Sequence, residues 1–173
     1  MLYEILTEIA EQLNQHFKLR FGVPEDKLFI SNIVNNDGSE PIEKDSVLLS
    51  IVNIQEEKTV LNRGNPSDDA PILLKLTIMF TTTFTGKRYA EGLKFIAEII
   101  GFFQQNKYLE IEGERIAFEI FNVELTQQNT IWTSLGAKYN PSIAYMASFI
   151  KIDESMATDP YVPASEFPTD DDD

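Results

Sequence analysis

The segment that most constrains the fold runs from residue 126 to residue 152, with the sequence TQQNTIWTSLGAKYNPSIAYMASFIKI. Thr126 is a favourable N-cap residue, and the apolar residues that follow recur on one helix face: Ile131, Trp132 and Leu135. Proline cannot continue a helix, so Pro141 forbids its extension. From residue 142 to residue 152 the chain alternates in the manner of a strand. The sequence therefore predicts a short helix and a long strand here, and neither carries a reactive group.

Two longer helices are predicted elsewhere in the chain. Residues 2–17 place apolar side chains on one stripe and acidic or amide side chains on the opposite face, and the sequence Gly-Val-Pro at 22–24 ends this helix. Residues 89–105 repeat apolar side chains at the same helical spacing, although Gly101 weakens the end of this helix.

The remaining regular segments are strand-like. Residues 47–54 are mostly apolar, which indicates burial on both faces, whereas residues 72–85 are rich in β-branched side chains and alternate. Further strands are predicted at 28–34 and 115–125, with a hairpin at 110–114 around Glu-Gly. Together these segments predict one compact α+β domain whose sheet, mostly antiparallel or mixed, has about five strands, with two longer helices and one short helix.

Composition separates a folded body from an acidic tail. The chain has 173 residues, no cysteine and a net charge of −14, and the part after Lys151 holds eight acids and no base. Residues 1–152 therefore carry −14 + 8 = −6 and are expected to form the domain, while residues 153–173, with three prolines, are expected to form a flexible tail. So acidic a body disfavours nucleic-acid binding, which depends on clustered Lys and Arg.

The sequence shows neither a signal peptide nor a membrane-spanning run, so synthesis and assembly in the cytoplasm are expected. The first residues place acids among the apolar side chains and lack a basic flank, so they do not resemble a signal peptide. No apolar run approaches the roughly 20 residues that span a bilayer, so no membrane partner is expected.

The sequence contains few candidate catalytic residues and no recognised catalytic motif. His16 is the only histidine and is best explained as a residue near the end of the first helix, where it interacts with the helix dipole. No G-x-S-x-G, Walker-type or G-x-G-x-x-G motif occurs, and the adjacent acids at 56–57 and 68–69 are typical of solvated loops. The sequence therefore predicts a protein that is not an enzyme and needs no cofactor or metal.

Four features are candidates for recognition. The loop residues Asn62 and Asn65 flank Arg63, a bidentate donor that either fixes its own loop or crosses to another subunit. Trp132 either fills the core beneath the last helix or anchors a partner. The threonine-rich strand, with Thr81 and Thr83, is either a half-exposed sheet face or an edge that pairs with a neighbour. In the tail, Tyr161 and Phe167 are candidates for docking on a neighbour.

The order of these motifs resembles a known family. An amphipathic helix precedes VLLSIVNIQEE, an Asn-Arg-x-Asn loop, PILLKLTIMFTTTF, a second helix and the closing segment IWTSLGAKYNPSIAYMASFIKI. In that segment a Trp-x-x-Leu helix leads through Tyr139 and Ser142 to Tyr145. Over residues 1–152 this arrangement is similar to the cap, or tube-terminator, proteins of phage-tail-like contractile injection systems, of the virulence-cassette and antifeeding type. Trp132, Leu135 and Tyr145 are then expected to be fold anchors.

The resemblance implies a structural role. A tail-terminator-like domain would form a homohexameric ring on the distal end of the inner tube, stop tube growth and join the tube to the last sheath layer. Its partners would be further copies of itself, the tube protein and the sheath protein, in a particle that can be released from the cell. Two alternatives remain: a phage tail-completion or sheath-terminator protein, and a non-enzymatic adaptor or ligand-binding module with a concave apolar pocket.

Overall fold

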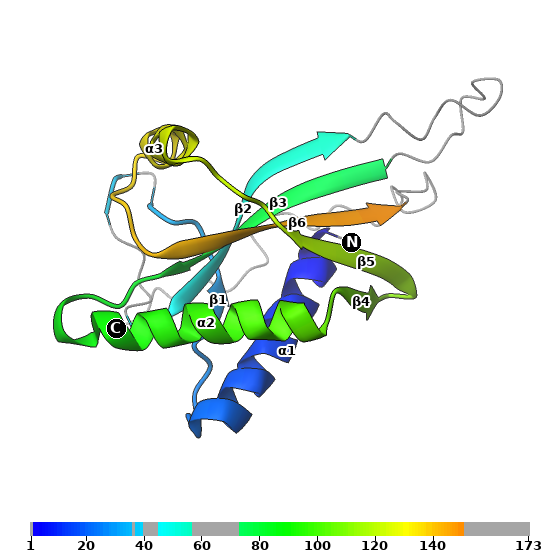
Figure 1. Cartoon of the computed structure of the whole chain (residues 1–173), viewed down its shortest axis with the longest axis horizontal. Coiled ribbons are helices and arrows are strands. Elements are labelled where there is room, and N and C mark those ends of the chain that lie inside the picture. Colours follow the sequence, from blue (N-terminus) through cyan, green and yellow to red (C-terminus); the bar gives the residue numbers. More distant parts are fainter. Residues whose placement is uncertain (1, 36, 40–44, 57–72, 151–173) are drawn as a thin grey trace, which may run out of the picture.

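The structure is a computed structural model that describes residues 2–35, 37–39, 45–56 and 73–150. Helices and strands are interspersed along the chain without a repeating pattern, and Figure 1 shows their arrangement. In chain order the elements are α1 (Leu2–Phe21), β1 (Leu28–Ile30), β2 (Val47–Glu56), β3 (Leu73–Thr82), the 3₁₀ turn η1 (Gly86–Arg88), α2 (Tyr89–Gln105), β4 (Tyr108–Ile111), β5 (Glu114–Ile120), α3 (Leu125–Ser134) and β6 (Ser142–Ile150).

The described strands form one mixed sheet of six strands in the order β1-β2-β3-β6-β5-β4. β1 and β2 run parallel, and the other neighbouring pairs run antiparallel. The α+β class, the mixed sheet and the three helices are as predicted; one more strand is present than the five expected. β4 is the first arm of the predicted hairpin, whose turn residues Glu112 and Gly113 have φ of 53° and 80°. Positive φ at both positions is what a two-residue turn of a twisted hairpin requires.

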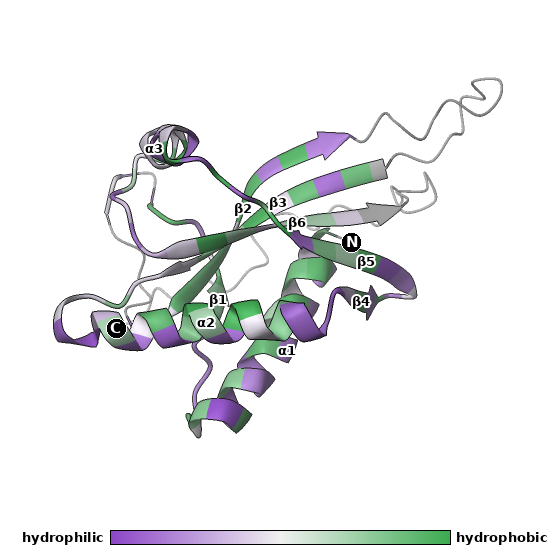
Figure 2. Ribbon diagram, in the orientation of Figure 1, coloured by the Kyte–Doolittle hydropathy of each residue, from purple (hydrophilic) through white to green (hydrophobic). Residues whose placement is uncertain are grey.

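The main core lies between one face of the sheet and the helices α1 and α2, which lie on the same side of the sheet in Figure 1. Aromatic rings dominate the helix contact: Phe95 meets Phe17 edge-on with a centroid distance of 4.9 Å and stacks on Phe84 at 5.3 Å. In Figure 2 both helices carry hydrophobic residues interrupted by hydrophilic ones, as amphipathic helices do. Burial of this apolar surface supplies the main driving force for the fold.

A second, smaller core lies on the opposite face of the sheet, under α3. Its buried members are Ile33, Met79, Trp132 and Ala144. Because successive strand residues point to opposite faces, Met79 faces α3 while its neighbours Ile78 and Phe80 enter the main core. The central strands are therefore covered on both faces near α3.

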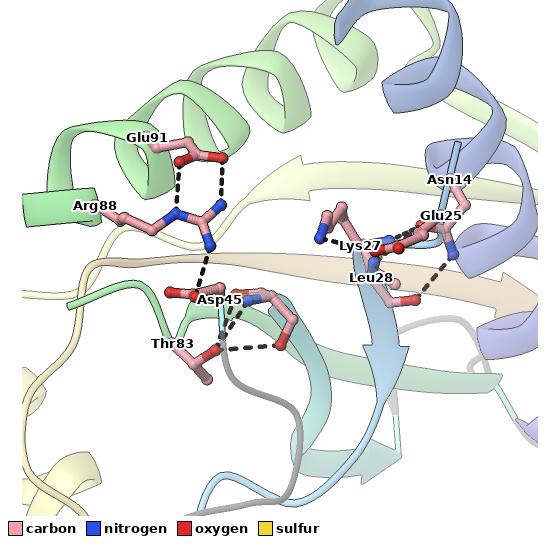
Figure 3. A network of polar contacts seen from close by, with 9 residues as sticks. Asn14, Glu25, Lys27, Leu28, Asp45, Thr83, Arg88 and Glu91 are labelled. Carbon is pink, nitrogen blue, oxygen red and sulfur yellow. Dashed lines mark hydrogen bonds and ion pairs between the residues drawn. The ribbon is translucent and has the colours of Figure 1, made fainter. Parts of the chain in front are cut away.

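Polar contacts fasten the segment before β2 to the start of α2 (Figure 3). The Arg88 guanidinium donates to both carboxylate oxygens of Glu91, at 2.9 and 2.7 Å, and to Asp45 Oδ2 at 2.6 Å. Bidentate geometry of this kind is specific to arginine. These hydrogen bonds, more than burial, hold the pKa of the Glu91 carboxyl below its usual range.

The predicted length of the first strand and part of the predicted burial of the second are wrong. The strand expected at 28–34 ends at Ile30, because the Asn32 side-chain amide donates to the Val34 carbonyl at 2.8 Å and turns the chain, so that Ile33 packs into the second core. Burial on both faces, predicted for residues 47–54, is confirmed for residues 47–50 but wrong for residues 53–54, which are exposed. β1 pairs only with residues 47–49 and so flanks only the start of β2.

The predicted start of α3 is also wrong. Glu124, not Thr126, is the N-cap: its side chain accepts from the backbone N–H of Gln127, and the Gln127 side chain accepts from the Glu124 N–H at 3.4 Å. The helix therefore starts at Leu125, and the strand expected to reach this residue stops at Ile120. A reciprocal capping box explains why a glutamate replaces the expected threonine.

Candidate partner interface

His16 joins the two long helices. Its Nε2 lies 3.1 Å from Glu98 Oε2 of α2, and its ring meets Phe102 edge-on at 5.6 Å. The Arg20 Nε donates to the other oxygen of the Glu98 carboxylate, also at 3.1 Å. Burial raises the pKa of Glu98, but the bonds from Arg20 and His16 outweigh it, so this pKa lies below its ordinary value. His16 thus contacts a second helix, in place of the expected interaction with its own helix end.

Within the described ranges, no group of three or more His, Cys, Asp or Glu side chains is arranged to hold a metal ion. No helix in that part of the chain has the length and apolar character needed to cross a membrane.

Five of the predicted interface residues lie outside the described residues. They are Asn62, Arg63 and Asn65 of the loop and Tyr161 and Phe167 of the tail. Lys151 and Ile152, at the predicted end of the last strand, lie outside them too.

The threonine-rich strand β3 does not offer an edge. It lies between β2 and β6 in the sheet, so pairing of this strand with a neighbouring subunit, one of the two alternatives, is wrong. Thr81 is 0% exposed, which leaves its side chain inaccessible to a partner in this conformation. Thr83 is partly buried, and its Oγ1 accepts from the Ser46 backbone N–H at 3.0 Å. Burial in the central strand therefore occupies Thr81, and the hydrogen bond with Ser46 occupies Thr83, within the protomer.

The three expected anchors lie in two different cores. Trp132 is 4% exposed in the second core, and the partly buried side chain of Leu135 packs against the same cluster. Tyr145 lies on the opposite face, 2% exposed, with its ring 4.5 Å from that of Phe103. Burial raises the pKa of Tyr145 to about 12. The tryptophan and leucine therefore hold α3 on the sheet, whereas the tyrosine belongs to the helix-covered core.

A concave surface beside α3 was not foreseen from the sequence. It encloses about 680 Å³. Every side chain that lines it is uncharged: Leu125, Thr126, Gln128, Asn129, Trp132, Thr133, Ala137 and Tyr139. We call this set the α3 groove. Leu125 is 82% exposed and Tyr139 is 59% exposed, while the buried Trp132 meets the Tyr139 ring edge-on at 5.6 Å. The signal that could have located this surface is the lack of charge around it in the sequence.

A smaller cavity of about 210 Å³ lies between α3 and the sheet and is lined by Met79, Phe121 and Trp132 among others. On the far side of the molecule, a groove of about 380 Å³ runs between α1 and β1, and three charged side chains, Glu11, Lys18 and Asp26, line it. The α3 groove thus differs from this second surface groove in its lack of charge.

Two solved structures share this fold. One is the sheath/tube terminator of an extracellular contractile injection system, PVC, in its extended state, with a TM-score of 0.55 and 13% identity, covering 83% of this chain and 55% of that chain. The other is the tube-terminating cap of the anti-feeding prophage, with a TM-score of 0.51 and 13% identity, covering 80% of this chain and 52% of that chain. This chain therefore spans about half the length of either protein.

No curated protein matches the sequence. The sequence model of the Pvc16 N-terminal domain, by contrast, matches residues 4–165. Since that match spans most of the 173 residues, the chain belongs to the Pvc16 N-terminal domain family.

Proposed function

We propose that this protein is a structural cap of a contractile injection system, which ends the inner tube and links it to the last sheath layer. The observation that carries the proposal is the family match over residues 4–165. The fold also supports the proposal, because it is similar to the folds of a sheath/tube terminator and of a tube-terminating cap. The role is steric, and it needs no reaction and no cofactor.

The proposed assembly is a homohexameric ring, as the sequence resemblance implies. A closed ring needs a heterologous contact, in which one face of each copy meets a different face of the next. Once seated on the terminal tube layer, the ring occupies the surface on which another layer would add. Residues 1–152 form the ring domain in this proposal, and the acidic residues 153–173 form a separate tail available to partners.

Tube protein and sheath protein are the proposed partners. The loop residues Asn62, Arg63 and Asn65 are proposed to contribute to the subunit contact, and Tyr161 and Phe167 to docking of the tail. Replacing Arg63 by alanine is expected to weaken ring assembly, because a guanidinium provides bidentate bonds that alanine cannot replace. Lys94→Ala, at an exposed position on α2, is the matched control for loss of one positive charge.

The deciding experiment removes this protein from a cell that assembles the particle. Electron microscopy of the particles should then show tubes of uncontrolled length or tubes without sheath, and a plasmid copy of the full chain should restore uniform length. Particles of normal length and normal sheath in its absence would overturn the proposed function.

A further inference from the structure

The region around α3 lacks charge in an otherwise highly charged chain. Of the 173 residues, 24% are charged, yet residues 120–150 contain Glu124 and Lys138 as their only charged side chains. This stretch includes α3, the loops on both sides of it and β6. The α3 groove is lined from within this stretch and contains neither of the two charged residues.

α3 contributes little to the core for its length. Of its ten residues, Trp132 alone is buried. A helix this short is marginal in isolation and is usually held by the apolar face that it packs. Here Leu125 lies at the first turn with 82% of its surface exposed, on the groove side of the helix. An exposed leucine, a half-exposed tyrosine and a concave uncharged floor are typical of the core of a protein–protein contact.

The other described surfaces carry acids. α1 presents Glu8 and Glu11, α2 presents Glu91 and Glu98 with nearby bases, and the β4–β5 hairpin presents Glu110, Glu112 and Glu114. Figure 2 shows β4 and the adjoining end of β5 in hydrophilic colours. These surfaces are suited to partners with exposed basic side chains.

Charge decides which partner suits the α3 groove. Two copies that each carry −14 repel one another, so the acidic face of one copy is opposed least by a face of the next copy that presents no acids. A basic partner would gain nothing from an uncharged surface and would bind one of the acidic faces instead. We propose that the α3 groove is a contact surface between copies of this chain. This inference rests on the proposed ring and deepens it, but self-association can be measured without tube protein.

Leu125→Glu tests the contact, because it places a charge in a desolvated apolar surface between acidic subunits. Leu19→Glu is the matched control: Leu19 is 89% exposed on the charged surface of α1. Sedimentation velocity of the full chain across a concentration series should show self-association of the wild type. Leu125→Glu should raise the dissociation constant at least about tenfold, which corresponds to a loss of about 1.4 kcal/mol, and Leu19→Glu should leave it unchanged.

Thermal unfolding followed by circular dichroism checks that both variants remain folded. A wild-type chain that stays monomeric throughout the series would overturn the inference. So would a folded Leu125→Glu chain that associates like the wild type, or a Leu19→Glu chain that is weakened equally. None of these outcomes bears on whether the protein ends the tube, because tube length in particles is a separate measurement.

A second measurement identifies the occupant of the groove. The chain has no cysteine, so Leu125→Cys and Leu19→Cys each give a single labelling site for an environment-sensitive dye. The dye at position 125 should shift to shorter emission wavelength as the concentration of unlabelled full chain rises, and the dye at position 19 should not. A shift at position 125 only on addition of purified tube protein would assign the groove to the tube and overturn the inference.

Discussion

Asn14 of α1 binds both backbone groups of Leu28 in β1. The Leu28 N–H donates to Asn14 Oδ1 and the Asn14 amide donates to the Leu28 carbonyl, each at 2.9 Å, as Figure 3 shows in part. The Lys27 N–H donates to the same oxygen at 2.9 Å. The side-chain amide thus takes the place that a further strand would occupy at this edge of the sheet, and it leaves these buried backbone groups paired.

Asn14→Ala should therefore destabilise the protein much more than the loss of an ordinary surface amide. Asn14 is 8% exposed, and its removal leaves two backbone donors and one acceptor without their partner. We expect a loss of about 2–3 kcal/mol in the free energy of unfolding, measured by urea denaturation. Gln15→Ala, at the exposed neighbouring position, is the control and should change it by less than about 0.5 kcal/mol. Equal effects of the two substitutions would show that the Asn14 bonds contribute little.

The contact between Glu98 and its two donors predicts a pH-dependent effect. The pKa of Glu98 is lower in the folded protein than its ordinary value of 4.5, so the folded state favours the carboxylate. The stabilisation is complete above that ordinary value and is lost as the pH falls through the folded pKa. Glu98→Gln should cost on the order of 1 kcal/mol at pH 7, because the side chain is 23% exposed and its bonds are partly screened.

Urea denaturation of Glu98→Gln and the wild type, repeated from pH 7 downward, tests this prediction. The difference in unfolding free energy should narrow once the pH falls below 4.5. Glu11→Gln, at an exposed position of α1, serves as the comparison for loss of one negative charge. A difference that stays constant down to acid unfolding would mean that the carboxylate charge is not what stabilises the helix pair.

We expect one substitution of Tyr145 to stabilise the folded protein. Its hydroxyl is buried and has no hydrogen-bond partner among the described residues, so it loses hydration without compensation. Tyr145→Phe keeps the ring against Phe80 and Phe103 and should raise the unfolding free energy by up to about 1 kcal/mol. Tyr145→Ala should instead lower it by about 3–5 kcal/mol through the cavity it leaves.

The same hydroxyl makes the wild type sensitive to alkali. The folded pKa of Tyr145 is raised from 10.0 to about 12, so unfolding releases a proton between those values and stability falls as the pH rises above 10.0. Tyr145→Phe should lose less stability over that interval. If this variant is less stable than the wild type at pH 7, the hydroxyl has a partner that stabilises it.

The sequence predicted the elements whose signals are local. The periodicity of α1 and α2 gave both helices, and α2 has the predicted bounds of 89 and 105. The turn pair Glu112-Gly113 located the hairpin, because its backbone conformation is set within four residues. By contrast, nothing local distinguishes Asn14 from other polar helix residues, since its role depends on β1 lying beside it.

The candidate site was less predictable for the same reason. The resemblance implied that Trp132 and Tyr145 are fold anchors, but the sequence could not show that they serve opposite faces of the sheet, because this depends on where α3 crosses it. The threonine-rich strand was predicted to be either a half-exposed face or a free edge, because it was read without its neighbours; β2 and β6 in fact cover both edges of β3. Strand order is a long-range property that a single alternating pattern does not contain.

Two glycines of α2 predict opposite effects of one substitution. Glycine inside a helix costs about 1 kcal/mol relative to alanine, so alanine is favoured wherever there is room. A Cβ at Gly101 would have nothing within 4 Å, whereas a Cβ at Gly92 would lie 2.9 Å from the Cβ of Phe84. Phe84 is 1% exposed and stacked on Phe95, so it cannot move without disturbing the main core.

Gly101→Ala should therefore raise the unfolding free energy by about 0.5–1 kcal/mol, while Gly92→Ala should lower it by about 1–3 kcal/mol. Each variant is the control for the other, because helix propensity changes equally in both and only the contact with Phe84 differs. Thermal unfolding and urea denaturation of the pair measure the difference directly. Stabilisation by both substitutions would mean that Phe84 gives way to a methyl group and that the close approach of α2 to this ring is not required.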